Sequence, residues 1–416
     1  MQQGDYPLAE VPASQRRGLL SSSLVLLGFT LFTATMWAGG SLGTAFPFGE
    51  LLGVILIGNL LLGSYAAALG WIACQSGLNT VLMGRFCFGE RGSHLADVIL
   101  GFTQIGWYAW GTATIAIALT RIIGLPEWLQ MPLMILFGFA FSLTAMVGYR
   151  GLELLSRFAV PLMLVFIAVS LATGMAEVGG IDGLLARTPE QHMSVTAAIT
   201  LVIGTFISGG TQATNWSRFA RSPRAAVIAT LAAFFVGNGL MVLTGAMGAL
   251  IYQQADIVDV MLAQGFLALA LLMLFFNIWT TQDNTIYNFA VAGCNLLRTD
   301  RRRAVTLGGA AIGTLLAVAG MYELLIPFLV LLGTFIPPIG GVIMADFWIK
   351  HRGRYPALAD SQLPAWNWHG LAAYAFGSAV AWGSPLLPPV AGVLAAALGY
   401  ALLLKLSRRA VVMKTK

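Results

Sequence analysis

Long apolar runs, separated by short charged or turn-rich breaks, dominate the pattern of the chain. A helix that crosses a bilayer needs about 20 mostly apolar residues. Cutting the sequence at its breaks gives twelve candidate spans at residues 18–43, 51–74, 94–120, 126–148, 152–174, 194–213, 224–250, 263–295, 304–321, 324–347, 369–385 and 388–405. The pattern therefore predicts an all-helical integral membrane protein with little mass outside the bilayer.

Composition supports this prediction. Hydrophobic residues make up 58% of the 416 residues and charged residues only 10%, whereas an ordinary soluble domain carries about 25% charge. The three cysteines, Cys74, Cys87 and Cys294, are scattered without metal-ligand spacing. The first apolar run follows a polar segment and is too long for a cleaved signal peptide. Soluble, disordered and disulfide-rich classes are excluded.

The placement of charge predicts how the spans are oriented. If the chain starts inside, all but two of its 23 basic residues, Arg121 and Arg187, fall in inside segments. The outside loops instead hold the acidic residues Glu50, Glu127, Glu177, Asp182, Glu190, Asp256, Asp259 and Glu323. Basic loops face the cytoplasm in membrane proteins, so both ends are expected inside. Orientation and anionic lipid explain the net charge of +6 without a nucleic-acid partner.

The spans group into repeating units. We expect a cytoplasmic tail at 1–17, a five-helix repeat at 18–174, a second, inverted five-helix repeat at 194–347, two more helices at 369–405 and a cytoplasmic tail at 406–416. The sequence contains no P-loop and no soluble domain, which argues against a pump driven by ATP.

Interrupted helices at matching positions of two repeats mark the binding site of many secondary transporters. Spans 1 and 6 begin the two groups of five, and each contains a glycine pair, Gly39-Gly40 and Gly209-Gly210, where a break is expected. The alternative is that these glycines only allow close helix packing. Pro337-Pro338 should kink or break span 10, either as a moving gate or as a fixed bend.

Span 8 carries a polar stripe inside an apolar run. Asn277, Thr280, Thr281 and Asn284 share one helix face because they are three, four and seven residues apart. Amide and hydroxyl oxygens suit a small, hard cation. Asp283 is the one acid expected well inside a span, where a charge is costly unless it faces a cavity or partner. A structural polar network is the alternative interpretation.

Span 3 places Gln104 and Trp107 on one face, with Gly111 one turn beyond the indole. An aromatic plate beside an amide suits a flat heterocycle, and Phe206 of span 6 could supply the second plate. Packing or interfacial aromatics are the plainer explanation. The spans offer no nucleophile–base pair, so an enzyme is not expected.

Taken together, these segments resemble the nucleobase–cation symporter-1 family. The matching stretches include GFTLFTATMWAGGSLGT, RFCFGERGS, GFTQIGWYAWG, GTFISGGTQATNWSRFAR, NIWTTQDNTIYN and IPPIGGVIMADFW, in order over most of the chain. The resemblance implies a LeuT-type fold of two inverted five-helix repeats followed by two C-terminal helices.

The resemblance also implies roles for residues. Substrate-binding positions would be Gln104, Trp107, Thr205, Phe206, Ser208, Gln282 and Asp283. Sodium would bind the carbonyls of Gly28, Leu31 and Asn277 and the hydroxyls of Thr280 and Thr281. Two positions depart from the expected pattern, with Gln282 in place of Asn and Thr205 in place of Ser.

The function that follows is sodium-coupled import of cytosine across the bacterial cytoplasmic (inner) membrane by alternating access. The partners would be a small-molecule substrate, the Na+ coupling ion and membrane lipid, with no obligate protein partner. Open alternatives are a related heterocycle such as a hydroxymethylpyrimidine, purine or hydantoin, proton coupling through Asp283, and a channel or receptor that does not transport.

Overall fold

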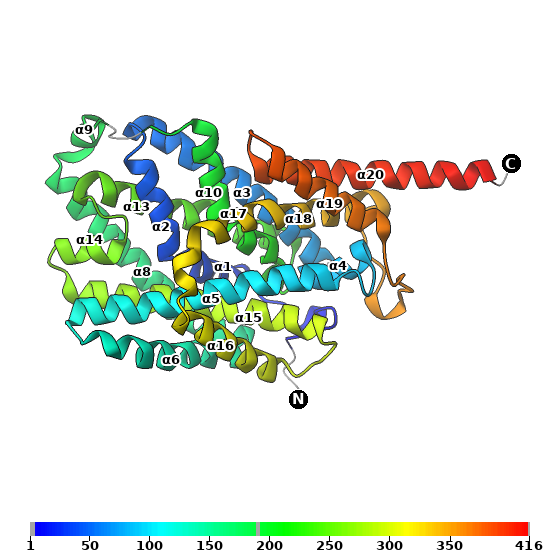
Figure 1. Cartoon of the computed structure of the whole chain (residues 1–416), viewed down its shortest axis with the longest axis horizontal. Coiled ribbons are helices and arrows are strands. Elements are labelled where there is room, and N and C mark those ends of the chain that lie inside the picture. Colours follow the sequence, from blue (N-terminus) through cyan, green and yellow to red (C-terminus); the bar gives the residue numbers. More distant parts are fainter. Residues whose placement is uncertain (1–4, 189–191, 415–416) are drawn as a thin grey trace.

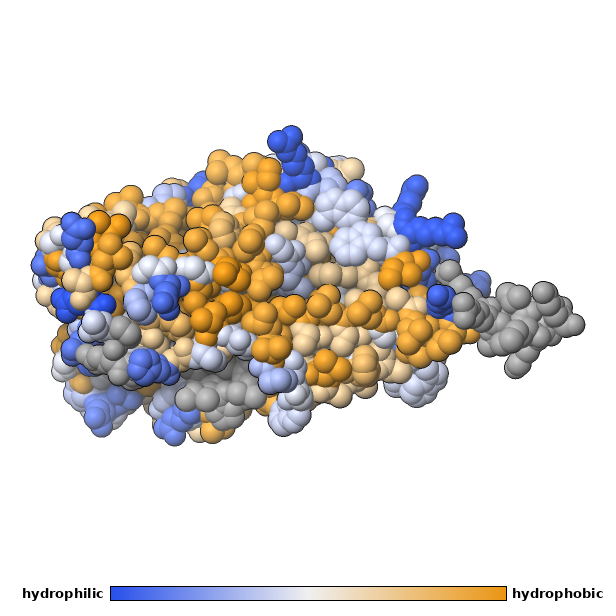
Figure 2. Space-filling view, turned by 90° about the horizontal axis from the view of Figure 1, so that it is seen from above, coloured by the Kyte–Doolittle hydropathy of each residue, from blue (hydrophilic) through white to orange (hydrophobic). Residues whose placement is uncertain are grey.

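The computed structural model describes residues 5–188 and 192–414. Within these ranges the chain is helical, and its one extended pairing is an isolated bridge between Arg17 and Ala220. The outer ends of both expected tails, together with Glu190 of an expected outside loop, lie outside the described residues. Most of the long helices run along the long axis of the molecule (Figure 1). On the face seen in Figure 2, hydrophobic residues cover most of the middle of the molecule, and hydrophilic residues lie at its ends and along its edges.

The helices follow the predicted spans closely. The first half contains α1 (Leu19–Thr30), α2 (Thr33–Gly43), α3 (Phe48–Ser76), α4 (Thr80–Phe88), α5 (His94–Ile123), α6 (Gln130–Ala140), α7 (Ser142–Val147), α8 (Tyr149–Glu177) and α9 (Gly180–Leu185). The second half contains α10 (Val195–Gln212), α11 (Thr214–Ser217), α12 (Pro223–Leu231), α13 (Asn238–Tyr252), α14 (Ile257–Ala263), α15 (Leu267–Leu296), α16 (Arg302–Val318), α17 (Leu325–Phe335) and α18 (Pro337–Ala345). Two helices, α19 (Trp368–Gly383) and α20 (Pro388–Lys414), follow in the C-terminal part of the chain.

Length and hydropathy identify membrane-spanning candidates among these helices. Seven segments of the described chain qualify, and the bent pair α1–α2 would be an eighth. The other four predicted spans coincide with helices that are short or polar. The helices α16 and α19 have 17 and 16 residues, and α5 and α15 have 30 residues each but carry many polar side chains. The count of twelve spans and the inside location of both ends stay predictions.

The break in span 1 lies elsewhere than predicted. The axes of α1 and α2 meet at 60°, and the interruption is at Leu31 and Phe32. The prediction of a break at Gly39-Gly40 was wrong, because both glycines lie inside α2. A Cβ atom added at Gly39 would be 2.9 Å from the backbone carbon of Val242, and one at Gly43 would be 3.0 Å from that of Ala246. These glycines instead let α2 cross α13 closely, which is the packing alternative.

Span 6 is interrupted within α10. Phe206 has non-helical backbone angles (φ −137°, ψ 18°), so the break precedes the predicted glycine pair. Gly209 serves packing, since an added Cβ atom would lie 2.6 Å from the ring of Phe206 and 2.7 Å from that of Phe29. The predicted break of span 10 is confirmed: α17 ends at Phe335, and α18 starts at Pro337.

The N-terminal segment packs against the helices. Arg218 donates to the carbonyls of Asp5 and Tyr6 at 2.6 and 2.7 Å. The Asp5 carboxylate forms an ion pair with the Arg302 guanidinium at 2.9 Å, and both side chains are nearly buried. The segment predicted as a tail therefore ties together the α11–α12 connection and the start of α16.

Candidate functional site

A narrow cavity lies where the broken helices meet α5 and α15. Its volume is only about 10 Å³, and it is lined by Phe29, Phe32, Gln104, Trp107, Thr205, Phe206, Ser208, Thr281 and Thr285. Five of the seven substrate-binding positions expected from the sequence therefore come together around one space. They arrive from α5 and from the two sides of the kink in α10.

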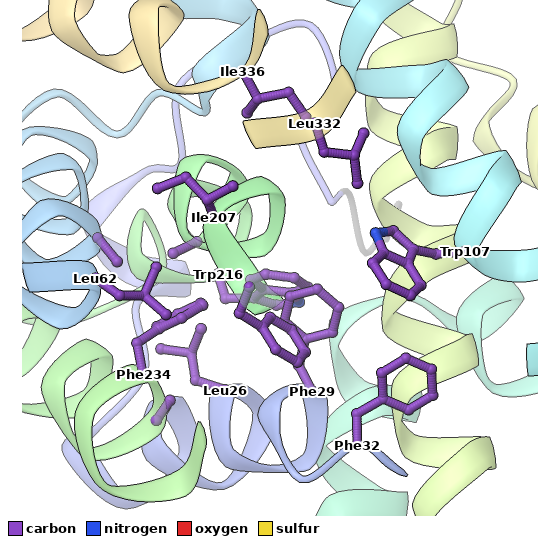
Figure 3. Close-up of a cluster of buried hydrophobic side chains, with 14 of the residues drawn as sticks. Leu26, Phe29, Phe32, Leu62, Trp107, Ile207, Trp216, Phe234, Leu332 and Ile336 are labelled. Carbon is purple, nitrogen blue, oxygen red and sulfur yellow. The ribbon is translucent and has the colours of Figure 1, made fainter. Parts of the chain in front are cut away.

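Four of the nine residues that line the cavity are aromatic. Trp107 and Phe206 are both buried, and Phe32 contacts both, with ring centroids 5.9 Å from Trp107 and 6.5 Å from Phe206. Figure 3 shows Phe29, from the end of α1, and Phe32, from the helix break, beside the space in front of Trp107. Sequence reasoning missed Phe29 and Phe32, because only the true position of the break turns them toward the site.

The helix α17 covers Trp107 from a further side. The Phe328 ring lies edge-on to the indole with centroids 5.7 Å apart. In Figure 3, Leu332 of the same helix extends toward Trp107. The helix α17 ends at Phe335 and α18 starts at Pro337, although the chain bends little enough at Ile336 for Leu331–Lys350 to count as one membrane span.

The cavity hydroxyls are partly engaged by the backbone. Thr205 donates to the Val202 carbonyl at 2.7 Å and accepts from the Asn238 amide at 2.9 Å. Thr285, one turn beyond Thr281, donates to the Thr281 carbonyl at 2.8 Å. Sequence reasoning overlooked Thr285, although its spacing of four residues from Thr281 was a signal that it shares the same face.

Gln282 and Asp283 do not line the cavity. The Gln282 amide donates to the Trp107 carbonyl at 3.1 Å and lies against Gly111 of α5. The Asp283 carboxylate accepts from Thr144 of α7 at 2.9 Å and from the Asn284 amide at 3.2 Å. Both side chains are fully buried. Their geometry favours support of the site over contact with a molecule in the cavity.

The end of α1 presents carbonyl oxygens without their usual helical donors. The Phe32 amide donates to the Thr30 carbonyl, the Thr33 amide to Asn277 Oδ1 at 2.9 Å, and the Thr35 amide to the Phe32 carbonyl. In a continuous helix these amides would bond to the carbonyls of Gly28, Phe29 and Leu31. A helix C-terminus also carries partial negative charge. The break therefore creates an oxygen-rich, electronegative place at the residues predicted to bind sodium.

Of the two predicted hydroxyl ligands, Thr281 contacts this helix end, whereas the Thr280 hydroxyl donates to the Phe276 carbonyl at 2.8 Å. Thr281 Oγ1 lies 3.4 Å from the Phe29 carbonyl oxygen, and the side chain of Thr280 packs beside Gly28. A further buried hydroxyl, that of Ser156 on α8, borders Gly28 and has no hydrogen-bond partner among the described residues. The oxygens of the break and of α15 thus meet, as an all-oxygen cation site requires.

Asn277 and Asp256 both bond to Thr33 at the start of α2. Asn277 contacts the break through its side chain, which accepts from the Thr33 amide. The Thr33 hydroxyl donates to the Asp256 carboxylate at 2.7 Å, and the same carboxylate caps α14 by accepting from the Val258 amide at 2.9 Å. Asp256 was predicted only as an outside acid. In the structure it links α14 to the broken helix.

Comparison with known proteins identifies the family. Residues 10–403 match the family model described as permease for cytosine/purines, uracil, thiamine, allantoin. The chain belongs to this permease family. Cytosine permease of Escherichia coli (strain K12) is 39% identical over 402 residues, which cover 97% of this chain and 94% of the relative. The permease is therefore a multi-pass protein of the bacterial inner membrane and not an enzyme, as the sequence predicted.

Solved structures support the fold. Mhp1, a nucleobase-cation-symport-1 family transporter in a closed conformation with bromovinylhydantoin bound, superposes with a TM-score of 0.84 at 18% identity, covering 99% of the permease and 96% of Mhp1. A Na+-coupled sialic acid symporter in its substrate-bound outward-open state gives 0.71 at 13% identity, covering 94% and 90%. The predicted family resemblance and the LeuT-type, all-helical fold are confirmed.

Proposed function

We propose that this permease imports cytosine together with a sodium ion by alternating access. The observation that carries the proposal is the adjacency of two features in α1, α10 and α15: an aromatic cavity with an amide, and an oxygen cluster at a helix break. Thr281 belongs to both, because it lines the cavity and approaches the Phe29 carbonyl. One residue thus joins the proposed substrate site to the proposed ion site.

The cavity suits a flat heterocycle. Trp107 and Phe206 would stack on its two faces, and each base–aromatic stack is worth about 1–3 kcal/mol. Gln104 and Ser208 would bind its polar edge. Phe32 now contacts both aromatic plates, so the base would have to displace this ring as it enters. The 39% identical cytosine permease supports cytosine as the substrate.

Sodium would bind the Gly28, Leu31 and Asn277 carbonyls and the Thr280 and Thr281 hydroxyls. Hard cations favour all-oxygen sites, and the Phe32 and Thr35 amides, which would bond to the Gly28 and Leu31 carbonyls in a continuous helix, bond elsewhere. The ion would hold α1 against α15. One charge moving down a potential of 100 mV supplies about 2.3 kcal/mol, which corresponds to roughly fifty-fold accumulation of cytosine.

We assign the moving parts to the two predicted repeats, 18–174 and 194–347. The helix α17 would act as the gate, because Phe328 already rests on Trp107, and the interruption at Ile336, directly before two prolines, would serve as its hinge. Rocking of the repeats around the broken helices would then expose the cavity to one side and afterwards to the other.

Uptake of radiolabelled cytosine into vesicles, with sodium or choline as the cation, tests the coupling. We expect concentrative uptake in sodium only. Thr281→Ala should raise the sodium concentration for half-maximal uptake about tenfold, since one of five ligands is lost. Thr173→Ala is the matched control, because this hydroxyl lies on α8 and donates only to the Val169 carbonyl. Equal uptake in choline would contradict sodium coupling.

The same vesicles distinguish the remaining possibilities. Uptake that follows a pH gradient without sodium, and that Asp283→Asn abolishes, would favour proton coupling. Unlabelled hydroxymethylpyrimidine, purine or hydantoin can also compete with labelled cytosine for uptake. If one of them inhibits at a lower concentration than unlabelled cytosine does, that heterocycle is the preferred substrate. Saturable, concentrative uptake excludes a channel or a receptor that does not transport.

A further inference from the structure

Gln104 presents an unusual polar group to the cavity. Its side chain is 1% exposed and lines the cavity wall, yet its amide nitrogen Nε2 has no hydrogen-bond partner among the described residues. A buried amide N–H without a partner costs about 1–3 kcal/mol. The cost is removed when a ligand in the cavity accepts that hydrogen bond.

Two buried asparagines fix which end of this amide faces the cavity. Asn288 of α15 donates from Nδ2 to Gln104 Oε1 at 3.5 Å. Asn215 of α11 in turn donates from Nδ2 to Asn288 Oδ1 at 2.7 Å. Both asparagines are at most 3% exposed, and neither lines the cavity. The Gln104 carbonyl therefore accepts a hydrogen bond on the side away from the cavity, and the NH2 group faces the cavity.

The threonines of the cavity offer no equivalent donor. Thr205, Thr281 and Thr285 each donate their hydroxyl hydrogen to a backbone carbonyl, those of Val202, Phe29 and Thr281 respectively. A hydroxyl that donates in this way can still accept. Among the amide and threonine side chains of the cavity wall, Gln104 is thus the one whose hydrogen-bond donor is not used by another described residue.

We propose that Asn215 and Asn288 are positioning residues that hold Gln104 as a hydrogen-bond donor, so that the cavity selects heterocycles with an acceptor edge. The inference rests on the proposed function in taking this cavity as the substrate site. The recognised edge is a carbonyl oxygen next to an unprotonated ring nitrogen, as in the O2 and N3 atoms of cytosine. A ring whose nitrogen at this edge carries hydrogen meets a second donor and is disfavoured.

Ligand analogues that each lack one acceptor test the proposal. In 4-aminopyrimidine the O2 carbonyl is missing and N1 carries no hydrogen, whereas in 4-amino-2-pyridone only the N3 nitrogen is replaced by carbon. Their affinities are measured by competition with radiolabelled cytosine on purified full-length permease in sodium. In the parent we expect one or both analogues to bind at least tenfold more weakly than cytosine, as loss of a buried hydrogen bond implies.

The variants connect this selectivity to the asparagines. Gln104→Leu and Asn288→Leu should each weaken cytosine binding about tenfold. For each analogue that the parent binds at least tenfold more weakly than cytosine, these variants should reduce the difference in affinity to within twofold. Gln104→Glu, whose carboxylate can only accept when it is ionised, should weaken cytosine binding further than Gln104→Leu at high pH. Asn295→Leu is the matched control, since this buried asparagine of α15 contacts Asp97 and not the cavity. It should leave the preference unchanged even if stability falls.

The outcomes separate the two hypotheses. A parent protein that does not bind cytosine contradicts the proposed function. A parent that binds cytosine while Asn288→Leu keeps the full preference overturns the positioning role alone. If Asn288→Leu does not fold, Asn215→Leu tests the same chain one step further from the cavity and should also reduce the preference. Equal binding of cytosine and both analogues by the parent overturns the acceptor-edge inference.

Discussion

Replacing Gly111 by alanine would force a methyl group into the space of the Gln282 side chain. The added Cβ atom would lie 2.5 Å from Gln282 Cδ and 3.2 Å from Cγ, whereas ordinary carbon contacts are about 3.5–4.0 Å. Gln282 would have to leave, and its bond to the Trp107 carbonyl would be lost. Overpacking costs about 1–3 kcal/mol and a hydrogen bond about 1 kcal/mol. We expect a loss of stability of about 2–4 kcal/mol.

Thermal unfolding measures this loss directly. The three cysteines are buried and free, so a thiol-reactive dye reports unfolding of the purified protein. Gly308→Ala is the control, because an added Cβ atom at Gly308 meets nothing within 4 Å. The double variant Gly111→Ala/Gln282→Ala should regain most of the stability, since the shorter side chain makes room. A Gly111→Ala protein that melts like the parent would refute this account of the α5–α15 contact.

Two further predictions follow from the site and the fold. Trp107→Ala should weaken cytosine binding by about 5- to 150-fold, the equivalent of one lost stack of about 1–3 kcal/mol; binding assays with labelled cytosine measure it, and an unchanged affinity would exclude the aromatic sandwich. Gly39→Ala should lower the yield of folded protein, because the close crossing of α2 and α13 has no room for a methyl group; size-exclusion profiles measure it, and a normal monodisperse yield would contradict the packing role.

Much of the site was predictable because its chemistry follows helical spacing. Gln104 and Trp107 are three residues apart, and Thr281 belongs to a polar stripe with the same period, so their shared faces could be inferred without a structure. Gln282 and Asp283 were assigned to the substrate by resemblance alone. Each successive residue turns by about 100° around a helix, which already rotates both away from the face of Thr281. The structure places them outside the cavity wall.

The position of the helix break could not be read from local sequence. Glycine pairs suggested a break at Gly39-Gly40, but the interruption at Leu31 and Phe32 depends on distant partners. The Thr33 amide bonds to Asn277, which is 244 residues away in the chain. A contact of this kind has no signature near residue 31. Phe29 and Phe32 were missed for the same reason, since their orientation follows from where the helix bends.

The polarity of α5 and α15 also has a consequence for how the protein is made. These two helices carry much of the site, and neither meets the hydropathy threshold that seven other segments pass. Each polar residue at the centre of a membrane helix raises the free energy of insertion. Neither helix is therefore well suited to move by itself from the translocon into the lipid bilayer. We therefore expect α5 to remain beside the translocon until α15 or another partner is synthesised, so that the residues of the site also influence the order of assembly.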